Sequence, residues 1–328
     1  MTDIDLYEQF DRVFTERILP ELETRLPRDW DSEPIYYYLD EVYTRKFRSG
    51  LGTLLCEALE LDPRPAEVVG AATEILWATL LVMDDIIDED TTRTGLEAAH
   101  VRYGLPRTTA SIGLALGAVD SILAQLGVCA LAPGVLTAMR RRYADATMGV
   151  MRSFLWERRR AHARDITTAQ LMELFVNKTI TGAGALSSVG AHIEGVRGGS
   201  FETTLFQYAN QLGIAGQLKN DVQDFSILAE GRAGSSDVKN GYINFPILLT
   251  IEHPDTDTPS LRAALAKGDE RHLIAEMGRV RAVEHCVELA HEAAERAVAT
   301  LEELPLTPQA RILLIRWANC NRIHATER

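Results

Sequence analysis

Helical periodicity runs along almost the whole of this 328-residue chain. Apolar residues recur three and four positions apart, which is typical of helices with one buried face, whereas the alternation that marks β-strands is scarce. The pattern predicts helices over residues 66–90, 108–127, 134–162, 168–192, 201–227 and 280–304. Turns rich in glycine and proline separate them, and Thr167 or Thr168 and Ser200 stand where helix caps are expected.

No repeat of fixed period, no low-complexity tract and no change of composition divides the chain. With 46% hydrophobic residues it can bury a large core, although it is long for one domain. We therefore predict one all-α domain over residues 1–328.

The net charge of −13 argues against a general nucleic-acid binder, because such proteins neutralise phosphates with basic patches. Two arginine runs, at 140–142 and 158–160, are interpreted as solvated helix faces. The four cysteines lack paired or zinc-binding spacing, and the acidic N-terminus lacks the apolar stretch of a signal peptide. These features favour a reduced, cytoplasmic protein.

Residues 111–139 are apolar enough to suggest a membrane span. Asp120, Gln125 and Pro133 interrupt them, so a buried helical hairpin is the preferred interpretation. No transmembrane segment is expected.

The stretch LLVMDDIIDEDTTRTG, residues 80–95, places five carboxylates directly after an apolar run. On a helix, Asp84 and Asp88 lie one turn apart on one face, with Cβ atoms about 5–6 Å apart, and Asp85 lies on the flank. Carboxylates this close repel each other unless a cation lies among them, and the helix dipole adds to the cost. Oxygen ligands in this number suit Mg²⁺, which completes its shell with water and substrate phosphate. The alternative is an acidic, solvated helix end.

The stretch GQLKNDVQDF, residues 216–225, repeats this arrangement after a second apolar helix. Asn220 and Asp224 are one turn apart, Asp221 flanks them, and Gln217 lies one turn earlier. Two helices with matching acidic turns can face each other across a bundle and build a metal site in its core. We therefore predict that Asp84, Asp88, Asn220 and Asp224 are metal ligands.

Basic residues near these motifs are candidates for binding a polyanion. Arg93 closely follows the first motif. Lys178 lies mid-helix among apolar and small residues, where a cation is costly without an anionic partner. Arg232 and Lys239 lie on a Gly/Ser-rich stretch, GRAGSSDVKNGYINFP, that can fold over bound phosphates as a lid.

Together these motifs resemble the trans-polyprenyl diphosphate synthase family of the isoprenoid synthase superfamily. DDIID at 84–88 is similar to the family's first Asp-rich motif, and NDVQD at 220–224 to the second, with Asn in place of its first Asp. Lys178-Thr179 matches the family's Lys-Thr pair, and residues 231–237 resemble its Gly-Lys…Gly-Ser-Asp loop. Residues 45–48 resemble the basic part of its N-terminal Gly-Gly-Lys-Arg-x-Arg-Pro motif.

The resemblance implies an orthogonal all-α bundle around a central cavity and, with the long apolar helices, a homodimer. Its two Asp motifs would hold three Mg²⁺ ions that bind the diphosphate of an allylic prenyl substrate of roughly C10–C20. The catalytic residues it implies are Asp84, Asp85, Asp88, Lys178, Asp221 and Asp224. The substrate-binding residues are Arg45, Lys46, Arg48, Trp77, Arg93, Thr179, Gln217, Arg232 and Lys239. Departure of the diphosphate leaves an allylic carbocation, which an acceptor, usually the alkene of isopentenyl diphosphate, captures.

The departures from the family fall where isopentenyl diphosphate would bind. Trp77 replaces a His or Gln, and Thr94 replaces the second Arg of an Arg-Arg-Gly run. The further replacements are Tyr43-Thr44 for paired glycines, Ser49 for a proline and Tyr242 for a lid lysine. Two interpretations stay open. Lys46 and Lys239 supply the missing charge, or the acceptor site is remodelled for a less anionic molecule, with Trp77 stacking on it or facing the carbocation.

Three functions are consistent with these motifs. A prenyltransferase that joins an allylic diphosphate to isopentenyl diphosphate or another acceptor is preferred. A terpene cyclase on the same fold is the alternative; Asn220 suits it, but the Ser/Glu pattern that should follow is replaced by Asp224 and Leu228. A non-catalytic partner subunit is the third, and the nearly complete Asp motifs argue against it. Thr79 and Leu80 lack aromatic bulk before the first motif, which favours room for a long prenyl tail.

Overall fold

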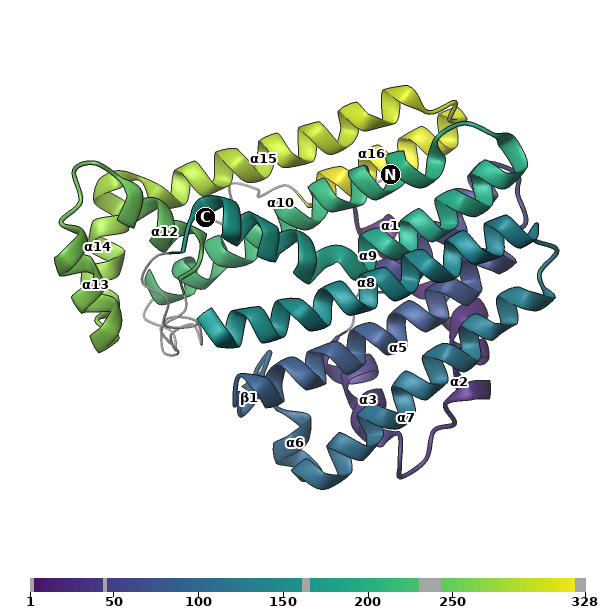
Figure 1. Cartoon of the computed structure of the whole chain (residues 1–328), viewed down its shortest axis with the longest axis horizontal. Helices are drawn as coiled ribbons and strands as arrows, with labels where there is room; N and C mark the ends of the chain where they lie inside the picture. The colour runs from purple at the N-terminus through teal and green to yellow at the C-terminus, as the bar shows by residue number, and fades with distance from the viewer. Residues whose placement is uncertain (1–2, 44–45, 161–165, 230–242, 322–328) are drawn as a thin grey trace. The chain divides into compact units, whose positions relative to one another are not determined.

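A computed structural model describes residues 3–43, 46–160, 166–229 and 243–321. Within these ranges the chain is helical apart from short connections and one hairpin (Figure 1). In the hairpin, β1 (Thr92–Arg93) pairs antiparallel with β2 (Leu96–Glu97), and Thr92 lies opposite Glu97. The prediction of an all-α protein is confirmed.

Contacts between residues divide the chain into two compact units. The first comprises Met1–Met148, Thr181–Gln207 and Thr300–Trp317, and the second comprises Gly149–Ile180, Tyr208–Ala299 and Ala318–Arg328. Three long helices contribute residues to both units: α8 (Pro133–Arg160), α9 (Thr168–Arg197) and α10 (Phe201–Ala229). The single domain expected from composition stays a prediction.

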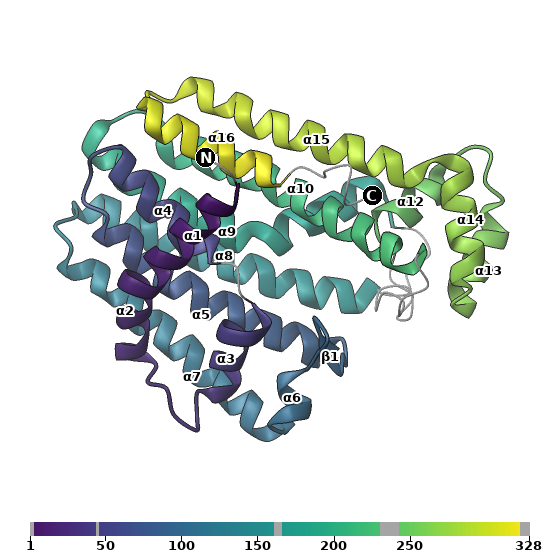
Figure 2. The same ribbon diagram turned by 180° about the vertical axis from the view of Figure 1, so that it is seen from behind.

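The first unit is built on α5 (Arg64–Ile87), which is buried almost continuously from Pro65 to Leu80. Helices α4 (Phe47–Ala58) and α7 (Leu105–Ala124) pack along it, and α1 (Asp3–Val13) packs on α4 (Figure 2). Gly50 permits that last contact, because a Cβ there would lie 2.9 Å from Phe10 Cα. The shorter elements are η1 (Phe14–Ile18), α2 (Leu19–Arg25), α3 (Glu33–Tyr37), η2 (Tyr38–Val42), α6 (Ala99–Arg102), η3 (Gln125–Val128), η4 (Leu301–Glu303) and most of α16 (Pro308–Cys320).

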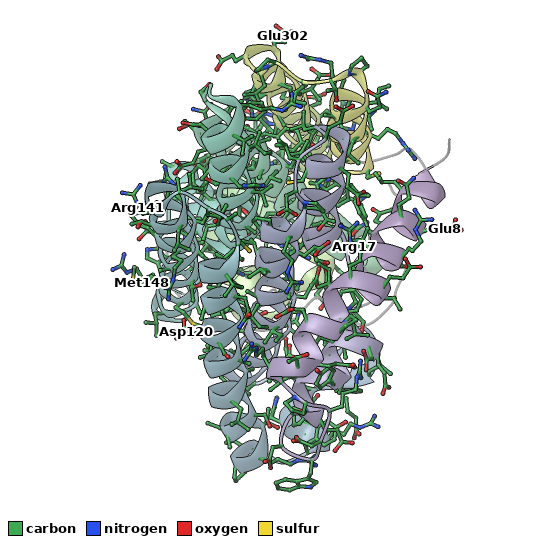
Figure 3. The ribbon with its side chains drawn as sticks, turned by 90° about the vertical axis from the view of Figure 1, so that its right-hand side faces the viewer. Glu8, Arg17, Asp120, Arg141, Met148 and Glu302 are labelled. Carbon is green, nitrogen blue, oxygen red and sulfur yellow. The ribbon has the colours of Figure 1, made fainter. Side chains whose placement is uncertain are left out.

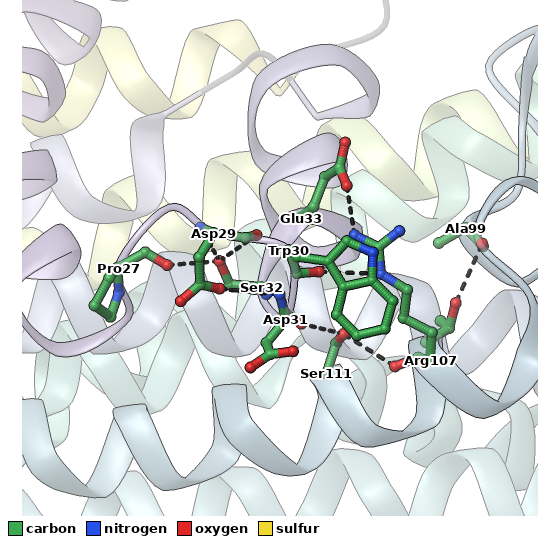
Figure 4. Close-up of polar contacts among 10 residues, drawn as sticks. Pro27, Asp29, Trp30, Asp31, Ser32, Glu33, Ala99, Arg107 and Ser111 are labelled. Atoms are coloured by element: carbon green, nitrogen blue, oxygen red, sulfur yellow. Dashed lines mark hydrogen bonds and ion pairs between the residues drawn. The ribbon is translucent and has the colours of Figure 1, made fainter.

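The connection between α2 and α3 is fastened to α7 by polar contacts (Figure 4). Arg107 donates from Nε to the Trp30 carbonyl at 3.0 Å and from Nη2 to the Glu33 carboxylate at 2.5 Å. Its guanidinium carbon lies 4.2 Å from the centre of the Trp30 ring, and Ser111 donates to the Asp31 carbonyl. These contacts fix the start of α3 and therefore of η2, which carries Tyr38 into the candidate site.

The second unit packs parts of α8, α9 and α10 with the helices that follow residue 243. Those helices are α12 (Phe245–Glu252), α13 (Thr258–Lys267), α14 (Glu270–Val280) and α15 (Ala282–Thr300). Asn244, Asp257 and Asp269 cap three of them by accepting backbone N–H groups, as short polar residues do at helix starts. Phe175, Leu218 and Phe245 lie in the core of this unit.

Each of the six predicted helices is present, with ends displaced by a few residues. Thr167 caps α9 together with Gln170: its hydroxyl accepts the Gln170 N–H at 3.3 Å, and the Gln170 side chain accepts the Thr167 N–H at 3.0 Å. The four cysteines are unpaired, as expected. The short helices before residue 60 and after residue 243 were not predicted, although α1 and α14 each carry an amphipathic pattern over their 11 residues.

The predicted hairpin over residues 111–139 exists, but the expectation that it is buried is wrong for its first helix. Two helices are long and apolar enough to cross a membrane by length and composition, Arg64–Ile87 and Leu105–Val128. The most apolar window of Arg64–Ile87 is 83% buried, whereas that of Leu105–Val128 is only 39% buried. α7 therefore has an apolar face that the described residues leave uncovered.

Candidate active site

The first acidic motif ends α5, and three of its carboxylates occupy different environments. Asp88 lies directly after the last residue of α5, and its N–H donates to the Asp84 carbonyl at 2.8 Å, so the one-turn relation predicted for Asp84 and Asp88 is present. Both side chains are half-buried, whereas Asp85 is fully buried. The motif thus has two half-buried carboxylates and one fully buried carboxylate.

Asp85 is held in the interior by two donors from other elements. The Tyr38 hydroxyl donates to Oδ2, and Arg93 Nε donates to Oδ1 at 2.5 Å. Burial raises the pKa of Asp85, and the positive charge of Arg93 opposes that shift. The pKa of Tyr38 is raised by burial and by the bond to Asp85, so its proton stays on the phenol. This network gives the end of α5 a fixed orientation.

Arg93 bridges two carboxylates of the motif. Its Nη2 donates to Asp84 at 2.7 Å while its Nε holds Asp85. Burial opposes the charge on Arg93, but the two carboxylates outweigh it and raise the pKa of the guanidinium. The hairpin positions Arg93 through a tight turn at Thr94 and Gly95, which both have positive φ. Arg93, which is predicted to contact the substrate, thus forms ion pairs with two carboxylates of the motif.

Negative charge is concentrated at this end of α5. Burial raises the pKa of Asp90, and the charges of Asp85 and Asp88 raise it further. Among the described residues, no three His, Cys, Asp or Glu side chains converge into a complete metal-binding group. The role of Asp84 and Asp88 as metal ligands stays a prediction.

The basic segment at the start of α4 has two described cations in contrasting positions. Lys46 is buried, and its ammonium donates to the carbonyls of Leu39 and, at 2.7 Å, Tyr43. Burial lowers the pKa of Lys46, and Glu74 opposes this shift. Arg48 instead stacks on Trp77, with its guanidinium carbon 3.7 Å from the ring centre. Lys46 can bind substrate, as expected from the sequence, only if its ammonium leaves these carbonyls. Arg48 is half-buried on α4 and donates to no backbone carbonyl among the described residues.

The second acidic motif lies on α10 in the second unit, with its residues in different surroundings. Asn220 is exposed and Gln217 is half-buried. Asp221 is buried and accepts the N–H of Phe245 at 2.9 Å, so it anchors the start of α12. The backbone of Asp224 continues α10, and its side chain lies outside the described part of the structure. The meeting of the two acidic motifs at one metal site stays a prediction.

Lys178 and Thr179 lie on α9 in the same unit. Lys178 is half-buried, less enclosed than its apolar neighbours suggested. The Thr179 hydroxyl donates to the Phe175 carbonyl at 2.8 Å, and a Cβ at Gly213 would lie 2.6 Å from Thr179 Cβ. Thr179 is therefore a packing residue where α9 and α10 approach closely. Arg45, Arg232 and Lys239 lie outside the described residues.

Two residues of the candidate site were missed from the sequence, Tyr38 and Glu74. No local pattern distinguishes Tyr38 within the run Tyr36-Tyr37-Tyr38. Glu74 has a signal, since it is a carboxylate within the apolar stretch EILWATLLVM three residues before Trp77. It is fully buried and accepts the Ser49 N–H at 3.0 Å.

Known proteins similar to this chain agree with the resemblance seen in its motifs. The family model described as Polyprenyl synthetase matches residues 29–291. The chain belongs to the polyprenyl synthetase family. It is 28% identical over 273 residues to a short chain isoprenyl diphosphate synthase of Methanothermobacter thermautotrophicus, covering 79% of this chain and 81% of that protein. It is 24% identical over 288 residues to the octaprenyl diphosphate synthase of Escherichia coli, covering 85% of each.

Solved structures of polyprenyl synthetases share the fold. Geranylgeranyl pyrophosphate synthetase from Pyrococcus horikoshii Ot3 superposes with a TM-score of 0.82 at 20% identity, covering 97% of this chain and 98% of that one. A polyprenyl synthase from Caulobacter crescentus, complexed with calcium and isoprenyl diphosphate, superposes with a TM-score of 0.80 at 20% identity, covering 96% and 97%. The resemblance in the acidic motifs thus extends to the fold of the isoprenoid synthases.

Proposed function

We propose that this chain catalyses the metal-dependent transfer of a prenyl group from an allylic diphosphate. The observation that carries the proposal is the end of α5, where Asp84 and Asp88 are half-buried carboxylates one turn apart while Asp85 is fixed inside by Tyr38 and Arg93. Family membership supports the same activity. The relatives described above are diphosphate synthases, which favours prenyl transfer over the terpene cyclase alternative.

The residues at the end of α5 fit a divalent cation. Asp84 and Asp88 supply hard oxygen donors, and the crowding of carboxylates around Asp90 makes a nearby cation favourable. We propose Mg²⁺, with three ions in the complete site and Asp84, Asp88, Asn220 and Asp224 as the protein ligands. Bound there, the ions neutralise diphosphate oxygens and favour departure of the leaving group.

The cationic side chains have separate roles in this proposal. Arg93 keeps its orientation through Asp84 and Asp85, and the substrate diphosphate becomes its third anionic partner. Lys178 donates to the same diphosphate. The allylic C–O bond breaks with its electron pair passing to the diphosphate, the acceptor's alkene adds to the carbocation, and the adduct loses a proton to the released diphosphate.

We propose isopentenyl diphosphate as the acceptor, because Arg48 stands at the position of the last arginine in the N-terminal motif that this chain resembles. A less anionic acceptor is the second candidate. It is favoured by Thr94, whose exposed side chain carries no charge, and by Lys46, whose ammonium is bound to backbone carbonyls.

Incubation with farnesyl or geranylgeranyl diphosphate, with and without isopentenyl diphosphate, tests the proposal. We expect diphosphate release that requires Mg²⁺ and falls to background in excess chelator, because the leaving group is otherwise unneutralised. A product longer by one isoprene unit identifies isopentenyl diphosphate as acceptor, and cyclic hydrocarbons identify a cyclase. Unchanged turnover in chelator contradicts the mechanism.

We also propose that the protein is a homodimer that uses α7. The uncovered face of α7 includes Leu114, which is 49% exposed, and it continues to Val128, which is 81% exposed. Figure 3 shows Asp120 on α7 and Arg141 and Met148 on α8 pointing away from the first unit. An interface related by a two-fold axis can pair Asp120 of one copy with Arg141 of the other while both α7 faces become buried.

The oligomeric state of Leu114→Glu, measured by light scattering after size-exclusion chromatography, tests this surface. Because a carboxylate buried in an apolar interface is unpaired, we expect the variant to be a monomer while the wild type is a dimer. Val196→Glu, which changes a residue 62% exposed on α9, is the control and should leave the dimer intact. A dimeric Leu114→Glu variant, or a monomeric wild type, contradicts the proposal.

A further inference from the structure

Arg48 is held by aromatic rings on α4, on α5 and at the end of η2. Its guanidinium carbon lies 3.7 Å from the centre of the Trp77 ring, 4.3 Å from that of Phe47 and 5.3 Å from that of Tyr43. Nη1 also donates to the Tyr43 hydroxyl at 2.5 Å. The Phe47 ring in turn packs on Trp317, with ring centres 4.3 Å apart. The guanidinium is therefore fixed to the core of the first unit through its aromatic contacts.

Arg48 differs from Arg93 in its anionic partners. Arg93 forms ion pairs with two carboxylates, whereas Arg48 forms none with any described carboxylate within salt-bridge distance. A guanidinium has five N–H donors, and Tyr43 uses only one end of it. The remaining donors are the feature that an anionic ligand recognises.

Glu74 is a buried carboxylate on α5 that bonds to the backbone of α4 and not to Arg48. Glu74 lies one turn before Trp77 on α5 and is fully buried, and its Oε1 accepts the Ser49 N–H at 3.0 Å. Burial raises the pKa of Glu74, the charges of Lys46 and Arg48 oppose that shift, and the second oxygen of Glu74 has no hydrogen-bond partner among the described residues. Glu74 thus secures the first turn of α4 by the backbone and leaves the guanidinium to the aromatic rings.

We propose that Trp77 is a positioning residue for the acceptor: it holds Arg48 so that the remaining guanidinium donors receive the acceptor's diphosphate. The proposal rests on the prenyl transfer argued above and names the role of one residue within it. Stacking fixes a long side chain that otherwise loses conformational freedom on binding, so affinity increases by preorganisation. Trp77 then acts through Arg48 and does not contact the acceptor or the carbocation.

The test is a double-mutant cycle on equilibrium binding. Isopentenyl diphosphate is titrated calorimetrically into protein saturated with Mg²⁺ and an unreactive allylic thiodiphosphate, in wild type, Trp77→Leu, Arg48→Gln and the double variant. Loss of one such stack corresponds to roughly a 3- to 30-fold weaker Kd in Trp77→Leu. Because Trp77 acts through Arg48, the double variant should bind no more weakly than Arg48→Gln alone.

Two controls distinguish failure of this inference from failure of the proposed function. Trp77→Phe keeps a ring face and should recover most of the affinity, and the Kd of the allylic thiodiphosphate should stay unchanged in every variant. Absence of isopentenyl diphosphate binding to wild type, an unchanged Kd in Trp77→Leu, or additive effects of the two substitutions would each overturn the inference. Absence of metal-dependent diphosphate release by wild type overturns the proposed function instead.

Discussion

Replacement of Asp84 by Ala should reduce the rate of diphosphate release from an allylic diphosphate roughly 10²–10³-fold, the cost typical of one preorganised electrostatic contact to a developing charge. The effect should appear in kcat, because the carboxylate acts on the leaving group as its charge develops. Single-turnover release of diphosphate at saturating Mg²⁺ measures it.

Glu97→Gln is the matched control for Asp84→Ala. It removes an exposed carboxylate on β2, in the hairpin that carries Arg93, and should leave the rate within about twofold because screened surface charges contribute little. Asp88→Ala should resemble Asp84→Ala. A wild-type rate in both Asp variants would show that the end of α5 is only an acidic helix terminus.

Replacement of Arg93 by Leu should reduce the free energy of unfolding of the ligand-free protein by roughly 3–5 kcal/mol, because it leaves a buried carboxylate without its cation. Asp85 is fully buried, and the Tyr38 hydroxyl is then its only described side-chain donor. Urea unfolding in the presence of chelator, followed by circular dichroism, gives the difference between variants.

A second substitution identifies the origin of that loss. Asp85→Asn in the Arg93→Leu background removes the uncompensated charge and should recover most of the stability. Arg64→Gln breaks an ion pair with Glu21 in which Arg64 is 43% exposed, and it should cost no more than about 1 kcal/mol. A loss in Arg93→Leu as small as that of the control would show that Asp85 is neutral or solvated without Arg93.

Long-range periodicity made the major helices predictable, because each keeps apolar residues at three- and four-residue spacing over many turns. α5 was predicted over residues 66–90 and spans Arg64–Ile87. The exposed face of α7 was not predictable, because an apolar helix has the same sequence pattern whether this chain or another protein surface covers it. The brief helices around Tyr38 depend on tertiary contacts such as that between Arg107 and Trp30, which no local pattern reveals.

The candidate site was predictable where spacing alone places groups on one helix face. The turn between Asp84 and Asp88 is of this kind. Contacts across elements were not predictable: Tyr38 lies 47 residues before Asp85, and nothing between them in the sequence marks the bond. Lys46 and Arg48 look alike as basic residues, yet one donates to backbone carbonyls and the other stacks on Trp77. Their side-chain directions depend on packing between α4 and α5.

The central claim is that the end of α5 binds an allylic diphosphate through a divalent cation. Calorimetric titration of wild type and of the Asp84→Ala/Asp88→Ala variant with a farnesyl thiodiphosphate, in Mg²⁺ and in chelator, tests it most directly. Binding by wild type should require Mg²⁺, and the double variant should lose that requirement together with most of its affinity. Equal affinity in Mg²⁺ and in chelator, or equal affinity in wild type and the double variant, would contradict the claim.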